Sequence, residues 1–289
     1  MTSVGLLLVD KPEGPTSHDV VDVVRRAVGV RRVGHTGTLD PFASGLMLLC
    51  VGWATRLAEY VTKLPKTYRG VIRLGQRTDT DDRTGAVVAE NERWKDLTSD
   101  QVRTALDEQR GELEQLPPAY SAKKVAGRRA YDVARKGGAP GLKAEAVTVH
   151  RLTLCDYELP DVTIEIECSS GTYIRSIARD VGESLGTGAH LWGLRRQRVG
   201  RFDVADAVGL DDVTSDKIVA AIRPPEQAVA HLATAELDAG ARAALSHGRS
   251  VEWGIGAGSG PVAVMVEGSL VAIAEPREGQ LWPQKVFGG

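Results

Sequence analysis

The sequence predicts an α+β protein with one large domain and a small, β-rich domain at its C-terminal end. A chain of 289 residues exceeds what a single hydrophobic core usually fills, so a large domain followed by a small one is expected. Up to about residue 230, alternating strand patterns are interspersed with amphipathic helical patterns. From about Leu237 the pattern changes to a short Ala-rich helix, a Gly-rich turn over 254–260 and short apolar strands.

Composition and cysteine usage favour an intracellular globular protein. Hydrophobic residues make up 42% and charged residues 26% of the chain, and no apolar run reaches the length needed to span a bilayer. The N-terminal residues lack the basic and apolar regions of a signal peptide. The three cysteines are odd in number and widely spaced, which fits neither a disulfide framework nor a zinc site. We therefore expect a cytoplasmic protein that does not contact membranes.

The first elements are a buried strand and a capped helix. The apolar run Gly5 to Val9 predicts a short strand that ends at a turn rich in Pro and Gly. Thr16 or Ser17 is placed to cap the following helix, and Gly29 is expected to end it.

A shaped loop, Gly34 to Gly45, leads into the apolar run Leu46 to Val51. Three glycines, two threonines and a proline in twelve residues cannot continue a helix or a plain strand. Asp40 lies inside this loop, directly ahead of an uncharged strand, so its carboxylate should lie near the core and be partnered. Because Asp before Pro is common in turns, a capping aspartate is the alternative interpretation.

The next strand, Lys66 to Leu74, shows the alternation of an amphipathic strand. Tyr68 lies at its start, where a strand end often opens onto a site; a core tyrosine with a satisfied hydroxyl is the alternative. The acidic segment 78–85 does not fit a calcium loop, because Arg83 stands where an oxygen ligand belongs and Thr84 where the loop glycine belongs. A charged turn is expected there, or else the border of a site.

Later elements are predicted by caps and periodicity. A capping box starts a helix over 98–109, and Val147–Leu154 and Val162–Cys168 alternate as paired strands. A helix then begins near Ile174, with Arg175 off its apolar stripe, a position that is usually solvated. Asp211–Ile222 is predicted as a further helix with a polar face, followed by a Pro-rich hinge.

A strongly basic segment lies between residues 117 and 146, although the formal net charge of the chain is −2. Tyrosines are interleaved with its cations, an arrangement that suits RNA, because cations meet phosphates and aromatic rings stack on unpaired bases. A solvated loop with a short helix is the alternative. The cations singled out for RNA binding are Lys123, Lys124, Arg128 and Arg129.

The loop around Asp40 resembles a known catalytic loop. Its pattern Gly-His-Thr-Gly-Thr-Leu-Asp-Pro-x-Ala-x-Gly-x-Leu is similar to that of the pseudouridine synthases. The form of the motif resembles that of the TruB-type enzymes, which act on the T-loop uridine of tRNA. Further segments resemble the same family: Asp-Lys-Pro-x-Gly-x-Thr-Ser near the N-terminus, Lys-x-Tyr at Tyr68, Pro-Pro-x-Tyr-Ser-Ala-x-Lys before the basic segment, and Gly-Thr-Tyr-Ile-Arg at Arg175.

This resemblance implies roles for individual residues. Asp40 would be the nucleophile and Arg175 its charge partner, which favours the ionised carboxylate against the effect of burial. Tyr68 would pack against the target uracil, and its hydroxyl could take part in proton removal from carbon 5. A uridine in a folded T-loop would have to be flipped out to reach them.

Four more residues are implied in substrate or RNA binding. His35 would fill space near the vacated base, although a loop histidine without such a role is the alternative. Leu194 would be an apolar contact in the uracil pocket, and Tyr173 belongs to the same motif as Arg175. Lys11 is a candidate phosphate contact, with a surface lysine in a turn as the alternative.

The resemblance also implies the architecture and partners. It implies a mixed, mainly antiparallel sheet flanked by helices over residues 1–230, with an RNA-gripping thumb at about 117–146, and a β-rich PUA-like domain over 234–289. The expected partner is the T-stem-loop of tRNA, without an obligate protein partner. Isomerisation needs no redox change, nucleotide energy source or metal, so no cofactor is expected; the sequence has no GxGxxG, no P-loop and no cluster at metal-ligand spacing.

Three other functions remain open at this point. A guide-dependent RNA pseudouridine synthase would share the catalytic loop. A non-catalytic tRNA-binding protein or chaperone would not need Asp40, Tyr68 and Arg175 together. A carboxylate-based hydrolase would need a second acid as proton donor, and none has a motif of its own.

Overall fold

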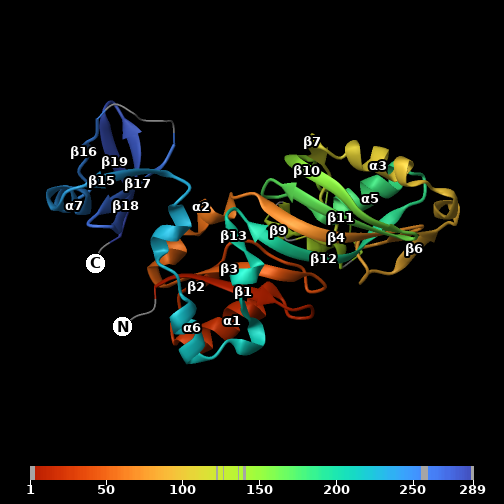
Figure 1. Ribbon diagram of the computed structural model, residues 1–289, viewed down its shortest axis with the longest axis horizontal. Helices are drawn as coiled ribbons and strands as arrows, with labels where there is room; N and C mark the ends of the chain where they lie inside the picture. Colours follow the sequence, from red (N-terminus) through yellow and green to blue (C-terminus); the bar gives the residue numbers. More distant parts are fainter. Residues whose placement is uncertain are drawn as a thin grey trace.

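The computed structural model describes residues 4–121, 123–125, 127–135, 137–138, 141–254 and 260–287. Figure 1 shows a large sheet with helices on its faces and a separate small sheet near the C-terminus. The fold prediction, an α+β protein with a mixed, mainly antiparallel sheet and a β-rich C-terminal part, is confirmed. None of the helices in the described residues is long and apolar enough to cross a bilayer.

The large sheet has ten strands within the described residues. Neighbouring strands are antiparallel except at the β1/β14 and β3/β12 pairs. In spatial order the main path is β14 (Val208–Gly209), β1 (Gly5–Lys11), β3 (Ser44–Val51), β12 (Ala189–Val199), β4 (Lys66–Leu74), β11 (Asp161–Cys168), β10 (Glu145–Glu158) and β7 (Gly111–Gln115), with β2 (Val33–His35) on β3 and β13 (Phe202–Asp203) on β12.

The helices follow the caps that the sequence predicts, with one exception. Thr16 and Thr98 each form a capping box, and Gly29 ends the first helix in the left-handed conformation. The predicted helix over 211–222 is wrong at its start, because Thr214 is extended and separates a 3₁₀ turn from the helix. The helices are α1 (Ser17–Val28), α2 (Ala58–Thr62), α3 (Ser99–Asp107), α4 (Ala130–Ala134), α5 (Ile174–Ser184), α6 (Ser215–Ala221) and α7 (Ala239–Ser246).

Both faces of the sheet are covered at β1 and β3. Alternate residues of an extended strand point to opposite faces, and here Leu7 and Leu49 join one buried cluster while Leu6 and Leu48 join another. The first cluster includes the apolar face of α1, and the second includes residues of the small sheet such as Phe287. This burial on two sides explains why these strands are nearly continuous apolar runs.

The small sheet has its own core and a contact with the large part. Its strand order is β15 (Ala233–Leu237), β17 (Val262–Val266), β18 (Ser269–Arg277), β19 (Gln280–Val286) and β16 (Val251–Glu252). Trp53 stacks on Phe287 with 4.7 Å between ring centroids. The domain limits 1–230 and 234–289 stay a prediction.

Two short hairpins lie outside both sheets. One pairs β5 (Gln76–Thr78) with β6 (Val87–Glu90), and its turn contains the acidic segment. The other pairs β8 (Lys124–Val125) with β9 (Arg128–Arg129), within the basic segment.

The large sheet is weakly joined in its middle. Strands β3 and β12 are connected by two residue pairs, Arg195 with Ser44 and Arg196 with Gly45. Gly45 has a φ of +106°, and a Cβ there would lie 2.3 Å from the carbonyl oxygen of Arg196, so only glycine fits this crossing. Within the described residues these two pairs are the whole ladder between β3 and β12.

Candidate active site

A cavity of about 250 Å³ lies next to the crossing of β3 and β12, between the loop before β3 and the start of α5. That volume lies at the lower end of ligand pockets, which suits one base or nucleoside. Both the loop 36–40 and the segment 169–175 line it, and the remaining lining residues are Thr62, Lys66, Tyr68, Leu194 and Arg196.

The loop that contains Asp40 is fixed from two sides. The buried Ser17 hydroxyl donates to the carbonyl of Leu39 (2.9 Å) and accepts from its amide (2.8 Å). On the other side of Asp40, the Pro41 carbonyl accepts from the amide of Gly14 at 2.8 Å. Because both neighbours of Asp40 are held by the β1–α1 turn, the carboxylate has a defined position at the cavity.

Arg175 lies between two carboxylates. Its Nε is 3.0 Å from Oδ2 of Asp40, and its Nη1 is 3.3 Å from Oδ2 of Asp82. Burial raises the pKa of Asp40, and the positive charge of Arg175 opposes that effect. The side chain of Asp40 is nevertheless 36% exposed, whereas those of Arg175 and Asp82 are almost fully buried, so Asp40 is the carboxylate that a substrate can reach.

The placement of Arg175 differs from what helical periodicity suggests. An arginine off the apolar stripe of α5 is usually solvated, but this one is 5% exposed. It donates to the carbonyl oxygens of Thr80 and Tyr120, both at 3.0 Å. Backbone acceptors from two loops therefore replace water around the guanidinium and orient it toward Asp40.

Asp82 was missed as a site residue by the sequence reasoning, which left the acidic turn as a charged turn or the border of a site. Its Oδ1 accepts from the amide and the hydroxyl of Thr84 and from the hydroxyl of Thr80. The pattern Thr-x-Asp-x-Thr was the available signal, because closely spaced hydroxyls can satisfy a buried carboxylate.

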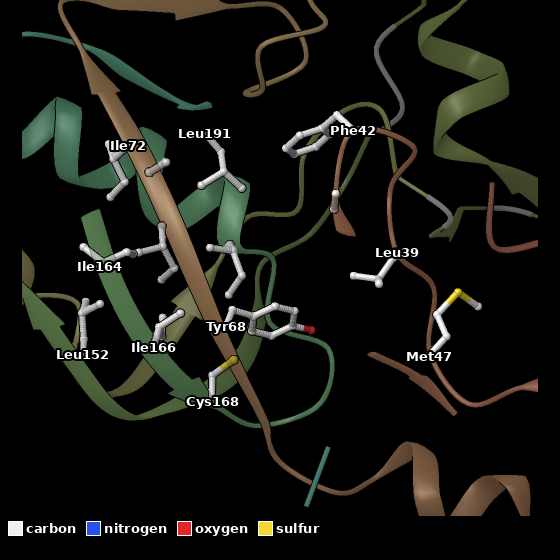
Figure 2. Packing of buried hydrophobic residues seen from close by; sticks show 14 of the residues in the cluster. Leu39, Phe42, Met47, Tyr68, Ile72, Leu152, Ile164, Ile166, Cys168 and Leu191 are labelled. Carbon is white, nitrogen blue, oxygen red and sulfur yellow. The ribbon is translucent and has the colours of Figure 1, made fainter. Parts of the chain in front are cut away.

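Tyr68 brings a phenol to the same cavity from β4. Figure 2 shows its ring beside Ile166 and Cys168, with the hydroxyl pointing toward the loop that contains Leu39. Burial raises the pKa of Tyr68, and the nearby charge of Arg196 opposes the shift. The tyrosine is thus a core residue with its hydroxyl at a cavity, which combines the two interpretations that the sequence left open.

Arg196 is the second residue that the sequence reasoning did not single out. It is 2% exposed, and its guanidinium donates to the carbonyls of Leu46 (2.6 Å), Gly37 (3.1 Å) and Thr38 (3.3 Å). These contacts tie β12 to β3 and to the loop that contains Asp40. The only signal was a cluster of arginines in this strand, which does not tell the buried one from its exposed neighbours.

Lys11 requires a correction. Both predicted placements, a phosphate contact and a surface lysine, need an exposed ammonium, but Lys11 is 0% exposed. Its Nζ donates to the carbonyls of Pro12 (2.8 Å) and Pro41 (3.4 Å), and burial lowers its pKa to about 8. The Pro41 loop covers this side chain, so Lys11 supports the loop from beneath.

The remaining predicted pocket residues differ in their placement. Leu194 and Tyr173 line the cavity, and the amide of Tyr173 donates to the Gln115 side chain at 2.7 Å. His35 lies on β2, just before the cavity-lining loop, and is not among the lining residues. Burial lowers the pKa of His35, with a further effect from Arg196, so its imidazole is neutral near pH 7.

The basic segment is described mainly by its backbone. The side chain of Lys123 pairs with Glu145, and the rings of Tyr120 and Tyr131 meet edge to face with centroids 6.0 Å apart. The side chains of Lys124, Arg128 and Arg129 lie outside the described part of the structure. Within the described residues, no group of three or more His, Cys, Asp or Glu side chains could hold a metal ion.

The chain matches two family models that meet at the start of α5. The N-terminal domain of the TruB family of pseudouridylate synthases matches residues 25–174, and the C-terminal domain of tRNA pseudouridylate synthase B matches residues 175–233. Together these models cover the loop of Asp40, the strand of Tyr68 and the helix of Arg175.

Similar proteins are found among curated sequences and solved structures. A tRNA pseudouridine synthase B from Thermobifida fusca is 42% identical over 99% of both chains, and one from Mycobacterium tuberculosis (strain H37Rv) is 42% identical over 86% of this chain and 85% of its own. The Cbf5–Nop10–Gar1 complex contains a chain with a TM-score of 0.75 and 26% identity, over 99% of this chain and 86% of its own. An H/ACA RNP bound to a substrate RNA containing 2′-deoxyuridine gives a TM-score of 0.74 at 25% identity, over 100% of this chain and 86% of its own.

Proposed function

Because the chain belongs to the TruB family of pseudouridylate synthases, we propose that it isomerises uridine 55 in the T-loop of tRNA to pseudouridine. The observation that supports this most directly is the position of Asp40, an accessible carboxylate held 3.0 Å from a buried arginine at a cavity of nucleoside size.

In the proposed reaction the ionised carboxylate of Asp40 is the nucleophile that starts cleavage of the N-glycosidic bond. Attack of the carboxylate on carbon 1′ of the ribose releases the uracil anion, which rotates in the cavity. Its carbon 5 then bonds to carbon 1′ and displaces the carboxylate. The proton on carbon 5 then leaves and N1 gains one, so no atom is lost overall. Tyr68, whose hydroxyl faces the cavity, is proposed to assist the removal of that proton.

The remaining lining residues supply a partly apolar cavity that excludes water from the base. Leu194 and the ring of Tyr68 offer apolar surface to the uracil, and the carbonyls and amides of the loop offer hydrogen bonds. A flipped base recovers part of its lost stacking energy on such a ring, which is worth about 1–3 kcal/mol per base.

The partners and the domain limits are proposals as well. We propose that the T-stem-loop is gripped by the thumb at about 117–146, that residues 234–289 form a PUA-like RNA-binding domain, and that the protein works in the cytoplasm without an obligate protein partner. Support comes from the basic, tyrosine-containing sequence of the thumb and from the separate core of the small sheet.

The experiment uses two unmodified tRNA transcripts, one with uridine at position 55 and one with cytidine there, and no guide RNA. Mapping by primer extension after carbodiimide treatment should find pseudouridine at position 55 of the first transcript alone. Conversion at other positions, or conversion that requires an added guide RNA, would contradict the proposal and favour the guide-dependent class.

A further inference from the structure

We infer that an arginine cluster at the end of α1, formed by Arg26, Arg31 and Arg32, binds the phosphate backbone of a double-stranded stem of the same tRNA. This surface is separate from the cavity and from the thumb. The inference rests on the proposed function for the identity of the RNA. It adds a second place where the RNA is held.

The cluster combines high charge density with a lack of local carboxylates. Residues 25–32 contain four arginines and no acid, in a chain whose net charge is −2. Among the described residues only Arg25 of these four has an ion pair, with Asp22 at 3.0 Å. The other three are exposed and have no carboxylate within ion-pair distance in the described part of the chain.

Helix stability explains only part of this pattern. Arg25 and Arg26 lie in the last turn of α1, where a cation compensates the helix dipole. Arg31 and Arg32 lie beyond the C-cap Gly29, outside the helix, so that effect does not account for them. The left-handed turn at Gly29 folds the chain back and forms a recess that is lined by Arg25 and Arg26 from the helix and by Arg31 from beyond it.

The cluster lies close to the catalytic loop along the chain and in space. The carbonyl of Arg32 accepts from the amide of Gly52 at 2.8 Å, which holds it at the end of β3. Strand β2 alone separates Arg32 from Thr36, the first residue that lines the cavity. At about 3.3 Å per residue, Arg32 lies roughly 13 Å from the cavity rim, a distance that one RNA stem can bridge.

The position of the cluster complements that of the thumb. In Figure 1, α1 and the thumb strand β9 lie on opposite sides of β1 and β3. The exposed Arg56 lies four residues after Gly52, the partner of the Arg32 carbonyl, and its Nη1 donates to the carbonyl of Val286 in the small sheet at 2.7 Å. A stem that leaves the cavity in this direction would run from the catalytic part toward the C-terminal sheet.

The arginines of this cluster are suited to bind phosphate groups. Guanidinium groups bind phosphate oxygens in a bidentate manner, and three exposed arginines without carboxylate partners need not first break an ion pair. Among the residues that the structure describes, no aromatic ring lines the recess, so the recess does not provide stacking for unpaired bases. The expected ligand is therefore the backbone of a paired stem, read without sequence preference.

The test compares Arg31→Gln/Arg32→Gln with a matched control, Arg93→Gln/Arg103→Gln. The control removes two exposed arginines near and on α3, which Figure 1 places away from α1, on the far side of the large sheet. The affinity of each protein for full-length tRNA is measured between low and moderate salt. Loss of two phosphate contacts should lower the slope of log Kd against log salt by about 1.4–1.8 and weaken binding roughly tenfold at moderate salt.

An unchanged slope in the Arg31/Arg32 variant would overturn the inference, and so would an equal decrease in the control. A second readout is the turnover number on a minimal T-arm stem-loop at saturating RNA, which should stay at the wild-type value because the cluster is outside the cavity. Loss of turnover on the stem-loop would also overturn the inference, because the substitutions would then have disturbed the structure of the loop that contains Asp40. Failure of the wild-type protein to convert the stem-loop would reject the proposed function instead, and the salt slopes would still test the cluster.

Discussion

Asp40 is subject to two opposing effects. Its burial favours the neutral acid and raises its pKa, whereas the guanidinium of Arg175 favours the anion. The second carboxylate at Arg175, Asp82, repels the anion of Asp40 and raises the pKa further. The carboxyl of Asp40 therefore accepts a proton at a higher pH than an exposed aspartate does, and the proposed reaction requires its anion.

The first prediction concerns the acid side of the pH–rate profile. Because Asp40 must be ionised, kcat/KM should fall as the pH is lowered through its raised pKa. Arg175→Gln removes the charge that lowers this pKa, so the acid limb should move to higher pH and the plateau should also decrease. Single-turnover rates measured across pH 5–8 on a T-arm stem-loop would show the shift.

The control for this prediction is Arg179→Gln, one turn further along α5. Arg179 pairs with Asp81 and Asp180 and does not line the cavity, so its removal should leave the acid limb in place. An acid limb that is the same in the Arg175 variant and the wild type would show that Arg175 does not set the ionisation of the essential group.

The second prediction separates the ring of Tyr68 from its hydroxyl. Tyr68→Phe keeps the apolar ring, so RNA affinity should be retained, but a hydroxyl that assists proton transfer contributes about 10²–10⁴-fold to the rate. The kcat on the stem-loop should fall by that order. Tyr157→Phe, which removes a hydroxyl bonded to the Leu97 carbonyl away from the cavity, should have no such effect; equal rates in both variants would remove the proposed role.

Residue-scale prediction from the sequence succeeds where a residue stands inside a local pattern. Asp40 and Tyr68 could be singled out because each lies in a short motif beside a strand. Arg196 could not, since its importance depends on partners distant in the chain, such as Thr38. Asp82 stands in a local threonine pattern, but its ion pair with Arg175 joins it to a distant helix. The error at Lys11 has the same origin, because its burial comes from a loop thirty residues away.

At the scale of the elements, the crossing of β3 and β12 positions the site. Gly45 allows the two backbones to meet, and Arg196 then ties the catalytic loop to the same place. Helix starts were predictable because capping boxes are local. The crossing was not, because it joins segments about 150 residues apart and no local pattern specifies their contact.

The third prediction tests this crossing with Gly45→Ala. The new Cβ would lie 2.3 Å from the carbonyl oxygen of Arg196, and the alanine would have to adopt a strained φ of +106°. The free energy of unfolding should therefore fall by at least about 2 kcal/mol. Denaturant titration measures the change. Gly34→Ala is the matched control, because it has no neighbour within 4 Å of the added methyl group and should cost under about 1 kcal/mol; similar losses in both variants would contradict the account.

At the scale of the whole molecule, the charge is unevenly distributed. A net charge of −2 argues against RNA binding only if the chain is treated as uniform. The basic segment at 117–146 and the arginine cluster at the end of α1 concentrate positive charge in two short stretches of the chain. Length and composition were enough to predict a large and a small part. The docking of Trp53 on Phe287 was not predictable, because the two residues are far apart in the chain.

The account as a whole rests on the carboxylate of Asp40, and the most direct measurement is the release of a tritium label from carbon 5 of uridine 55 in a T-arm stem-loop. The wild-type protein and Asp100→Asn, which changes an exposed carboxylate on α3, should release the label at equal rates. Asp40→Asn should bind the same RNA with unchanged affinity and release no label. Appreciable release by Asp40→Asn would contradict the central claim.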